Sequence, residues 1–312
     1  MIELIVDCDT GIDDALALMW LAGRTDVHIV AVGSVHGNID AETSALNSLK
    51  ILEICGGVEV PVAIGARRPL VAPLHLATYV HGEDGLGNAG LERPARKPEP
   101  ISAIEQLVSL ARSRPGELQL LATGPLTNLA LALAIEPRLP QLLQRVVVMG
   151  GAVGVPGNIT PLAEANFYHD PEAAAAVLDA GFNLVMVGLD VTSKVFLDAS
   201  HLAELSASSP KGQLAARILP HYMDFYAPIL NRRACLLHDP LAAALVVERD
   251  LAQYEQLRVK VELGGEWTRG ASLVDRRGGI QPGELRTVSV ATDVDSERFL
   301  QLFLDGILAK AE

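Results

Sequence analysis

The sequence predicts an α/β protein with a single doubly wound, mostly parallel open sheet and helices on both faces. Three observations support this fold class. Short β-branched runs recur without strict polar alternation, which is typical of parallel strands covered on both faces. Segments with helical spacing separate these runs, and a repeated strand-then-helix order favours a doubly wound sheet. The 312 residues, 49% of them hydrophobic, can bury a large core, and no repeat or low-complexity linker divides them, so we expect one domain over 1–312.

The expected elements alternate along the first part of the chain. The strand-like runs are 2–8, 27–35, 118–123, 145–151 and 183–189. The helical patterns are 13–23, 41–57, 101–113, 125–137 and 170–181. Several of these helical patterns close with glycine or with Glu-Pro, both of which end helices.

The last third of the chain is less regular. Its expected elements are helices near 199–230 and 239–248, strands over 254–263 and 285–292, and a final helix over 296–312. The proline-rich stretch 93–100 is the one candidate linker, but its composition is more typical of a surface loop.

Composition and charge exclude several classes of protein. A net charge of -13 without a Lys/Arg cluster disfavours nucleic acid as a partner. The most apolar window, 118–135, is interrupted by Gly124-Pro125, so no membrane span is expected. The first residues lack the pattern of a secretory signal, which predicts a cytoplasmic location. Three scattered cysteines fit neither a disulfide framework nor a thiolate metal site.

Four aspartates fall within "DCDTGIDDALAL", residues 7–18, where the first strand should turn into a helix. Asp7 closes the strand, Asp9 lies in the turn, and Asp13 and Asp14 fall in the first helical turn. One or two carboxylates could simply cap the helix. Four exceed that need, and like charges raise one another's pKa unless a cation neutralises them. The cluster therefore favours a hard divalent cation such as calcium or magnesium.

Polar residues also follow other expected strands, where a doubly wound sheet forms its ligand crevice. His36 and Asn38 follow the second strand, and the glycine-rich loop 81–88 carries His81 and Asp84, although both segments could be ordinary turns. Thr123 ends a strand and could offer its backbone carbonyl to calcium, but such a turn needs no metal.

The long loop 149–174 is a further candidate, because long loops in compact domains are usually functional. Its Asn158, Glu164 and Asn166 are suited to hydrogen bonding with a sugar. Asp170-Pro171 has the pattern of a helix N-cap. Asp239-Pro240, directly after His238, fits a cap equally well when taken alone.

Together these segments resemble, in order and approximate spacing, the inosine–uridine-preferring nucleoside hydrolase family. The segments that carry the resemblance are "DCDTGIDDA", "HGN", "HGEDGLG", "TGPLTNLA", "MGG…GN…AEANFYHDPEAA" and "CLLHDPLA". Agreement extends from the first strand to about residue 248 and is weaker over 267–278. The resemblance implies an open α/β fold that binds calcium and hydrolyses the N-glycosidic bond of ribonucleosides to ribose and free base. It also implies a homodimer or homotetramer.

The resemblance implies roles for individual residues as well. Asp9, Asp14, Asp239 and the Thr123 carbonyl would hold calcium, and Asp9 would take a proton from the metal-bound water. His238 would face the leaving base as proton donor. Asp13 would hold ribose hydroxyls. The other implied substrate contacts are Asn38, Asn158, Glu164 and Asn166 at the ribose, Met149 beside the sugar, and His81 on the base side.

The base preference and two rival functions stay open at this stage. Strictly purine-specific members stack the base between tryptophans, whereas only Trp20 and Trp267 occur here, so we expect a broad or pyrimidine-leaning preference. Tyr222 and Tyr226 fit either a base pocket or core packing. One rival is a metal-dependent phosphohydrolase, which should place Lys or Arg near the aspartates. The other is a non-catalytic ribose or nucleoside-binding protein, which would need no proton donor.

Overall fold

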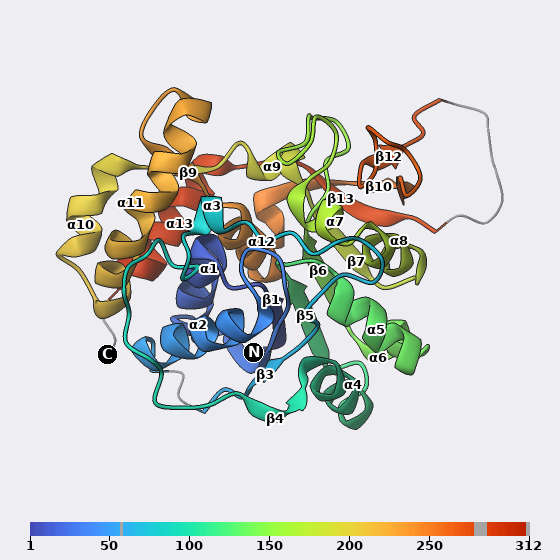
Figure 1. The fold of residues 1–312 in the computed structure, drawn as a ribbon, viewed down its shortest axis with the longest axis horizontal. Coiled ribbons are helices and arrows are strands. Elements are labelled where there is room, and N and C mark those ends of the chain that lie inside the picture. The colour runs from blue at the N-terminus through green and yellow to red at the C-terminus, as the bar shows by residue number, and fades with distance from the viewer. Residues whose placement is uncertain (57–58, 278–285, 310–312) are drawn as a thin grey trace.

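The computed structural model describes residues 1–56, 59–277 and 286–309, and it confirms the α/β class (Figure 1). Within these ranges a nine-stranded sheet is parallel throughout except for its first pair. Its strands, in spatial order, are β10 (Ala252–Leu257), β13 (Val288–Val294), β7 (Leu184–Val187), β6 (Arg145–Met149), β5 (Leu118–Ala122), β1 (Ile2–Cys8), β2 (Val27–Ser34), β3 (Val62–Ile64) and β4 (Glu99–Ser102). Two small sheets pair β8 (Phe196–Asp198) with β9 (Ala234–Leu236) and β11 (Val259–Val261) with β12 (Ser272–Val274).

The chain builds the large sheet outward from β1 in two directions. It first adds β2, β3 and β4 on one side, and then returns to pair β5 with the other side of β1. The strand order therefore reverses between β1 and β5. Ligands of open α/β sheets bind beside such a reversal, at the carboxyl ends of the strands. The loops that carry Asp9 and Thr123 leave the sheet at this place, and the Thr123 N–H donates to the Asp7 carbonyl over 2.9 Å.

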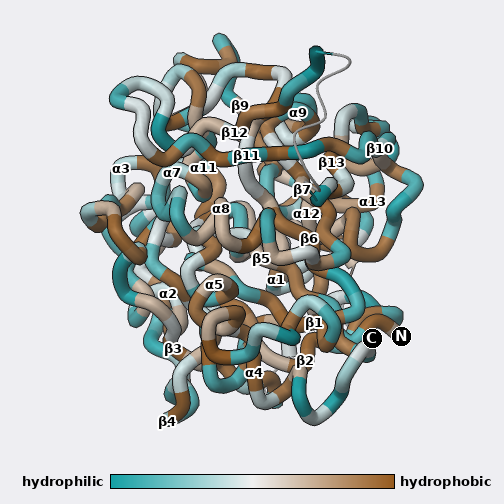
Figure 2. Tube along the Cα trace, turned by 90° about the vertical axis from the view of Figure 1, so that its right-hand side faces the viewer, coloured by the Kyte–Doolittle hydropathy of each residue, from teal (hydrophilic) through white to brown (hydrophobic). Residues whose placement is uncertain are grey.

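Helices cover both faces of the sheet, and the two layers lie on opposite sides in Figure 1. One layer comprises α1 (Ile12–Ala22), α2 (Ala41–Ile54), α11 (Pro210–Leu230), α12 (His238–Val247) and α13 (Ser296–Leu308). The other comprises α4 (Ala103–Ser113), α5 (Thr127–Ile135) and α8 (Pro171–Asp179). Alternation along β1 sends Leu4 and Val6 into the first core and Ile5 into the second. Figure 2 shows the hydrophobic segments running through the sheet and its covering helices.

Several short helices complete the described fold. They are α3 (Thr78–His81), α6 (Leu139–Leu142), α7 (Ala165–His169), α9 (Leu189–Thr192), α10 (Leu202–Ser206) and two 3₁₀ turns at Ala199–His201 and Arg249–Leu251. No helix in the described ranges combines the length and apolar character that crossing a membrane requires.

The structure divides one expected strand, and it agrees with the surface loop expected over 93–100 except at the last two residues. The strand expected over 254–263 is two strands, because β10 pairs with β13 and the chain then enters β11 of a separate small sheet. The proline-rich stretch 93–100 runs along the surface and enters the edge strand β4 at its Glu99. The start of the expected strand 285–292, the end of the expected helix 296–312 and the end of the pattern 41–57 lie outside the described residues.

Trp20 joins α1 to the C-terminal helix and supports a stability prediction. Its side chain is 1% exposed, and the indole Nε1 donates to the Leu302 carbonyl over 3.1 Å. We expect Trp20→Ala to lower the free energy of unfolding by about 3–5 kcal/mol, because the change leaves a large cavity and removes the hydrogen bond to Leu302. Urea unfolding measures the loss. Trp20→Phe should lose less, and equal stability of wild type and Trp20→Ala would contradict the packing role.

Candidate active site

The loop between β1 and α1 positions the aspartates of the opening motif. Gly11 lies so close to His81 that an added Cβ would lie 2.5 Å from the ring Nδ1, which accounts for the glycine in this turn. Asp14 caps the new helix, because its Oδ2 accepts from the Gly11 N–H over 2.9 Å. Its other oxygen, Oδ1, accepts from the Thr123 hydroxyl over 2.7 Å. The turn thus joins the ends of β1 and β5 directly.

Three buried carboxylates converge at this point. Asp13, Asp14 and Asp239 each present an oxygen, and these atoms lie within 4.8 Å of one another. Burial, and then the neighbouring carboxylates, raise the pKa of Asp13 to about 7 and those of Asp9 and Asp239 well above their usual range. Asp13 Oδ1 is buried without a hydrogen-bond partner among the described residues. Such a set of oxygens suits a hard divalent cation, which would offset the repulsion.

Asp9 is held slightly apart from this cluster. Its Oδ2 accepts from the Asn38 backbone N–H over 2.7 Å, and its Oδ1 accepts from the Asn38 amide over 3.1 Å. The same amide donates to Asp14 Oδ2 over 3.0 Å, so Asn38 links the two carboxylates. The structure therefore gathers Asp14 and Asp239 as expected, with Asp13 as their third member. The expected ligand set containing Asp9 stays a prediction.

The Thr123 carbonyl and the residues of α7 form the adjoining polar wall. Asn166 donates its Nδ2 to the Thr123 carbonyl over 2.7 Å and to the Met149 carbonyl over 3.1 Å. Because both partners are acceptors, the amide orientation is fixed and its Oδ1 remains free to accept. Glu164 caps α7 and also accepts from the Gly151 N–H over 2.8 Å. Burial raises the pKa of Glu164 to about 7.

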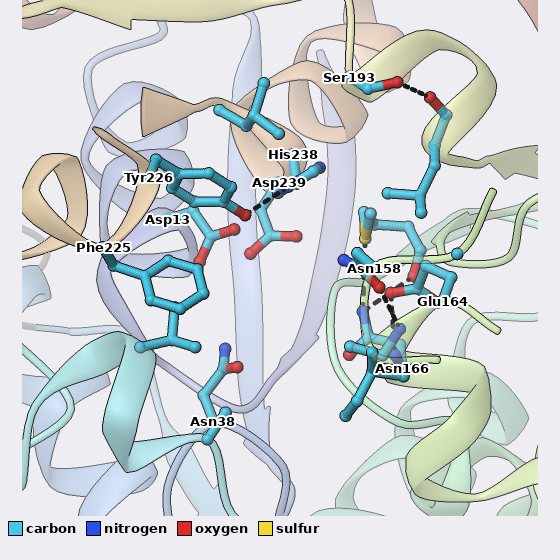
Figure 3. Close-up of a pocket in the computed structure, with 18 of the residues that line it drawn as sticks. Asp13, Asn38, Asn158, Glu164, Asn166, Ser193, Phe225, Tyr226, His238 and Asp239 are labelled. Carbon is cyan, nitrogen blue, oxygen red and sulfur yellow. Dashed lines mark hydrogen bonds between the residues drawn. The ribbon is translucent and has the colours of Figure 1, made fainter. Parts of the chain in front are cut away.

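All of the substrate-binding residues expected from the sequence line one cavity of about 410 Å³. They are Asp13, Asn38, His81, Met149, Asn158, Glu164, Asn166, Tyr226 and His238, and Thr123 and Asp239 join them. Figure 3 shows Asp13 and Asp239 between an aromatic side, with Phe225 and Tyr226, and a polar side. Among the described residues, no lysine or arginine lines this cavity.

Two neutral histidines lie on the aromatic side. His81 Nδ1 accepts from the Ile12 N–H over 3.1 Å, so the ring proton is on Nε2. Burial, and then neighbouring histidines, lower the pKa of His81 to about 3. His238 places its Nε2 3.0 Å from the Tyr226 hydroxyl, and burial lowers its pKa to about 4. Tyr222 donates to Asp13 Oδ2 over 3.1 Å, so this tyrosine supports the carboxylate cluster and is not only packed in the core.

The two expected helix caps have different outcomes. Asp170 caps α8 as expected, by accepting from the Ala173 N–H over 3.0 Å. The cap alternative for Asp239 is wrong, because α12 begins at His238 and Leu237 holds the N-cap position. Asp239 instead lies in the first turn, with its carboxylate in the acidic cluster.

Other motif residues support the loops around the cavity. Asp7 points to the α5 side of the sheet, where its Oδ1 accepts from Asn128 over 2.7 Å. His36 bonds Thr127 over 3.0 Å. Asp84 accepts from backbone N–H groups of its own loop, as in an ordinary turn.

Sequence reasoning missed two residues of α9. Asp190 accepts from the N–H groups of Val153 and Gly154 over 3.0 and 2.7 Å, which fixes the start of the long loop that carries Asn158. Thr192 bonds His238 Nδ1 over 2.8 Å. Both follow the strand-like run 183–189, so the rule that picked out the other strand ends could have identified them.

The doubly wound sheet and the carboxylate cluster at its reversal point define an α/β protein with a group of carboxylates that could bind a cation, beside a small-ligand cavity. Comparison with known proteins narrows this class. The sequence model of the inosine-uridine preferring nucleoside hydrolases matches residues 4–301. The chain therefore belongs to the inosine-uridine preferring nucleoside hydrolase family, whose members are N-glycosyl hydrolases.

Individual relatives agree with this assignment over nearly the whole chain. A probable uridine nucleosidase of Arabidopsis thaliana is 33% identical over 98% of this chain and 97% of its own length. The solved structure of a plant nucleoside hydrolase has a TM-score of 0.95 at 32% identity, covering 98% of this chain and 99% of its own. A purine-preferring ribonucleoside hydrolase from Gardnerella vaginalis has a TM-score of 0.92 at 30% identity, covering 98% of both chains.

Proposed function

We propose that this protein hydrolyses the N-glycosidic bond of ribonucleosides to ribose and free base, using calcium to activate water. The observation that carries the proposal is the group of three buried carboxylates, Asp13, Asp14 and Asp239, beside a cavity that no described lysine or arginine lines. Such a site needs a cation for its charge balance and has no basic side chain to bind a phosphate group. The absence of that basic group disfavours the phosphohydrolase alternative.

The donor set fits calcium. Asp14, Asp239, the Thr123 carbonyl and Asp9 would hold the ion, and hard oxygen ligands of this kind are those that calcium prefers. The unpaired Asp13 Oδ1 is further support, because a buried carboxylate oxygen without a partner calls for a cation or a ligand hydroxyl. A bound calcium ion would supply orientation and acidification of a water molecule.

The polar wall would hold the ribose. Asp13 accepts hydrogen bonds from ribose hydroxyls, and the fixed Asn166 amide offers its Oδ1 as another acceptor. Glu164 and the rim residue Asn158 complete this wall, which Figure 3 shows facing Asp13. Several simultaneous hydrogen bonds fix the sugar against the attacking water and lower the entropic part of the barrier.

Two sides of the cavity would carry out different parts of the reaction at the sugar. Cleavage passes through an oxocarbenium-like transition state, which needs an activated water on one face and help for the departing base. Asp9 removes a proton from the attacking water. The neutral His238 donates a hydrogen bond from its Nε2–H to the base as it departs, which stabilises the negative charge that develops on the base. The water displaces the base directly, so no covalent intermediate with the enzyme forms.

The aromatic side of the cavity supports a broad or pyrimidine-leaning preference. His81 presents an Nε2–H that stays a donor over the physiological pH range, since its Nδ1 is occupied by the Ile12 N–H. A pyrimidine carbonyl is a suitable acceptor for this donor. The similarity to a uridine nucleosidase favours the same preference. A purine-preferring enzyme shares the fold, so the fold alone does not set the base.

A panel of ribonucleosides, incubated with and without a calcium chelator, tests the proposed function. We expect release of reducing sugar from uridine, cytidine and inosine, a loss of at least about tenfold with chelator, and recovery with excess calcium. Nucleoside binding without ribose release would indicate the non-catalytic alternative. Phosphate release from phosphate esters would indicate a phosphohydrolase. Full activity after exhaustive metal removal would contradict the calcium proposal. A homodimer or homotetramer and a cytoplasmic location stay predictions.

A further inference from the structure

Thr192 is completely buried behind His238 and does not line the cavity. It ends α9, and its hydroxyl lies 2.8 Å from His238 Nδ1. We propose that Thr192 is a positioning residue that holds His238 in the tautomer with its proton on Nε2, the nitrogen beside Tyr226. The inference deepens the proposed function, because it rests on the donor role of His238.

The direction of this hydrogen bond follows from the partners of the hydroxyl. Among the described residues, His238 Nδ1 is the one hydrogen-bond partner of the Thr192 side chain. A hydroxyl always carries a proton, and leaving that proton unpaired in the interior is unfavourable. The Tyr226 hydroxyl on Nε2 lines the cavity and can donate to solvent or a ligand, whereas Thr192 is fully buried. Thr192 therefore donates, and His238 Nδ1 accepts. The proton of the neutral ring is then on Nε2.

A second threonine–histidine pair in the same protein shows the opposite direction. Thr127 is also buried and lies 3.0 Å from His36 Nε2. However, the Thr127 hydroxyl donates to Asp170 Oδ2 over 2.6 Å, so its oxygen must accept from His36. The presence or absence of a carboxylate beside the threonine thus decides whether the ring nitrogen that faces the threonine carries the proton. Thr192 has no such carboxylate among its described partners.

A backbone hydrogen bond helps to hold Thr192 and His238 next to each other. Leu237, directly before His238, donates its N–H to the Val195 carbonyl over 3.1 Å. This bond ties the start of α12 to the segment that follows α9. With the ring held in this way, its Nε2–H points toward the Tyr226 hydroxyl at 3.0 Å, on the aromatic side of the cavity. The other tautomer would present an acceptor there and could not donate to a departing base.

Thr192→Val tests the inference, since valine keeps the shape and removes the hydroxyl. We expect kcat for uridine to fall about tenfold, because part of the help to the leaving base is lost, while KM changes by less than about twofold. With 4-nitrophenyl riboside, whose leaving group needs little help, kcat should fall by less than about threefold. Thr192→Ser restores the hydroxyl and should stay within about twofold of wild type on both substrates.

Thr127→Val is the matched control, because it also removes a buried threonine hydroxyl from a histidine. Thr127 lies outside the cavity lining, so any loss should be equal for the two substrates. Equal losses for uridine and the aryl riboside in Thr192→Val would overturn the inference. So would an unchanged kcat for uridine.

The tautomer itself can be observed without an activity measurement. Long-range ¹H–¹⁵N spectra of the ¹⁵N-histidine-labelled protein separate the two neutral tautomers, and the signals missing from His238→Ala assign the ring. We expect an unprotonated Nδ1 in wild type and Thr192→Ser. A protonated Nδ1 in wild type would overturn the inference whatever the kinetics. If His238→Ala itself shows equal losses on both substrates, the proposed donor role of His238 is wrong. The tautomer measurement would still test whether Thr192 sets the position of the ring proton.

Discussion

Replacing Asp9 with asparagine is expected to lower kcat on every ribonucleoside by about 10³-fold while the protein stays folded. Asp9 would both contribute to the calcium site and remove the proton of the attacking water. Asparagine has nearly the same shape but no basic oxygen, and it weakens the charge that holds the cation. The effect should be similar for good and poor leaving groups, because it acts on the water and not on the base.

The folded state should tolerate this change. Asp9 is fully buried, and burial with the nearby Asp14 raises its pKa well above the usual range, so removing one charge relieves repulsion. The Asn38 N–H keeps an acceptor in the asparagine side chain, provided that the amide oxygen faces it. Thermal unfolding should therefore occur close to the wild-type temperature.

Asp7→Asn provides the matched control. Asp7 belongs to the same motif, is also buried, and has its pKa raised to about 7 by that burial. Its carboxylate faces Asn128 on the other side of the sheet, so kcat should stay within about fivefold of wild type. Steady-state kinetics on uridine and inosine compare the two variants. Near-normal turnover by Asp9→Asn, or an equal loss in both variants, would contradict the assigned role of Asp9.

Much of this site could be predicted because its residues follow the ends of strands, and the local sequence pattern indicates where those strands end. A β-branched strand followed by aspartates and a helical pattern places Asp13 and Asp14 at a strand end. The strand-then-helix repeat then brings such ends together at one edge of the sheet. The His238-Asp239 pair is different, since its local pattern matches a cap. Its membership of the cluster depends on α12 packing against α1, which one segment cannot reveal.

The features that the sequence did not predict depend on contacts between segments that are distant in the sequence. Asn38, on another loop, donates to both oxygens of Asp9, and the sequence around Asp9 gives no indication of this contact. Thr192 lies 46 positions before His238 in the sequence, and the residues around Thr192 do not indicate that the two side chains are in contact. The division of the expected strand 254–263 also depends on which distant strands are available for pairing. Periodicity describes one element at a time, so it cannot specify such partners.

The second large effect is expected for His238→Ala, and it should depend on the leaving group. Hydrolysis of uridine or inosine should slow by about 10²–10³-fold, because uracil and hypoxanthine are poor leaving groups when no donor assists them. An aryl riboside such as 4-nitrophenyl riboside needs little assistance, so its kcat should fall by less than about tenfold. Comparing kcat on the two kinds of substrate measures the difference directly.

Two controls separate the donor role of His238 from its effect on the nearby carboxylates. Asp239 follows His238 directly, so a disturbed cation site would lower activity on all substrates and raise the calcium concentration needed for half-maximal activity. His238→Gln keeps a side-chain donor and should recover part of the loss on uridine alone. Tyr226→Phe removes the hydroxyl that lies 3.0 Å from Nε2 but leaves the histidine donor in place, so its loss should be smaller. At saturating calcium, His238→Ala could lose the same activity on uridine and on the aryl riboside. That result would mean that His238 binds the substrate or supports the site structure, because a group that assists the leaving base cannot affect both substrates alike.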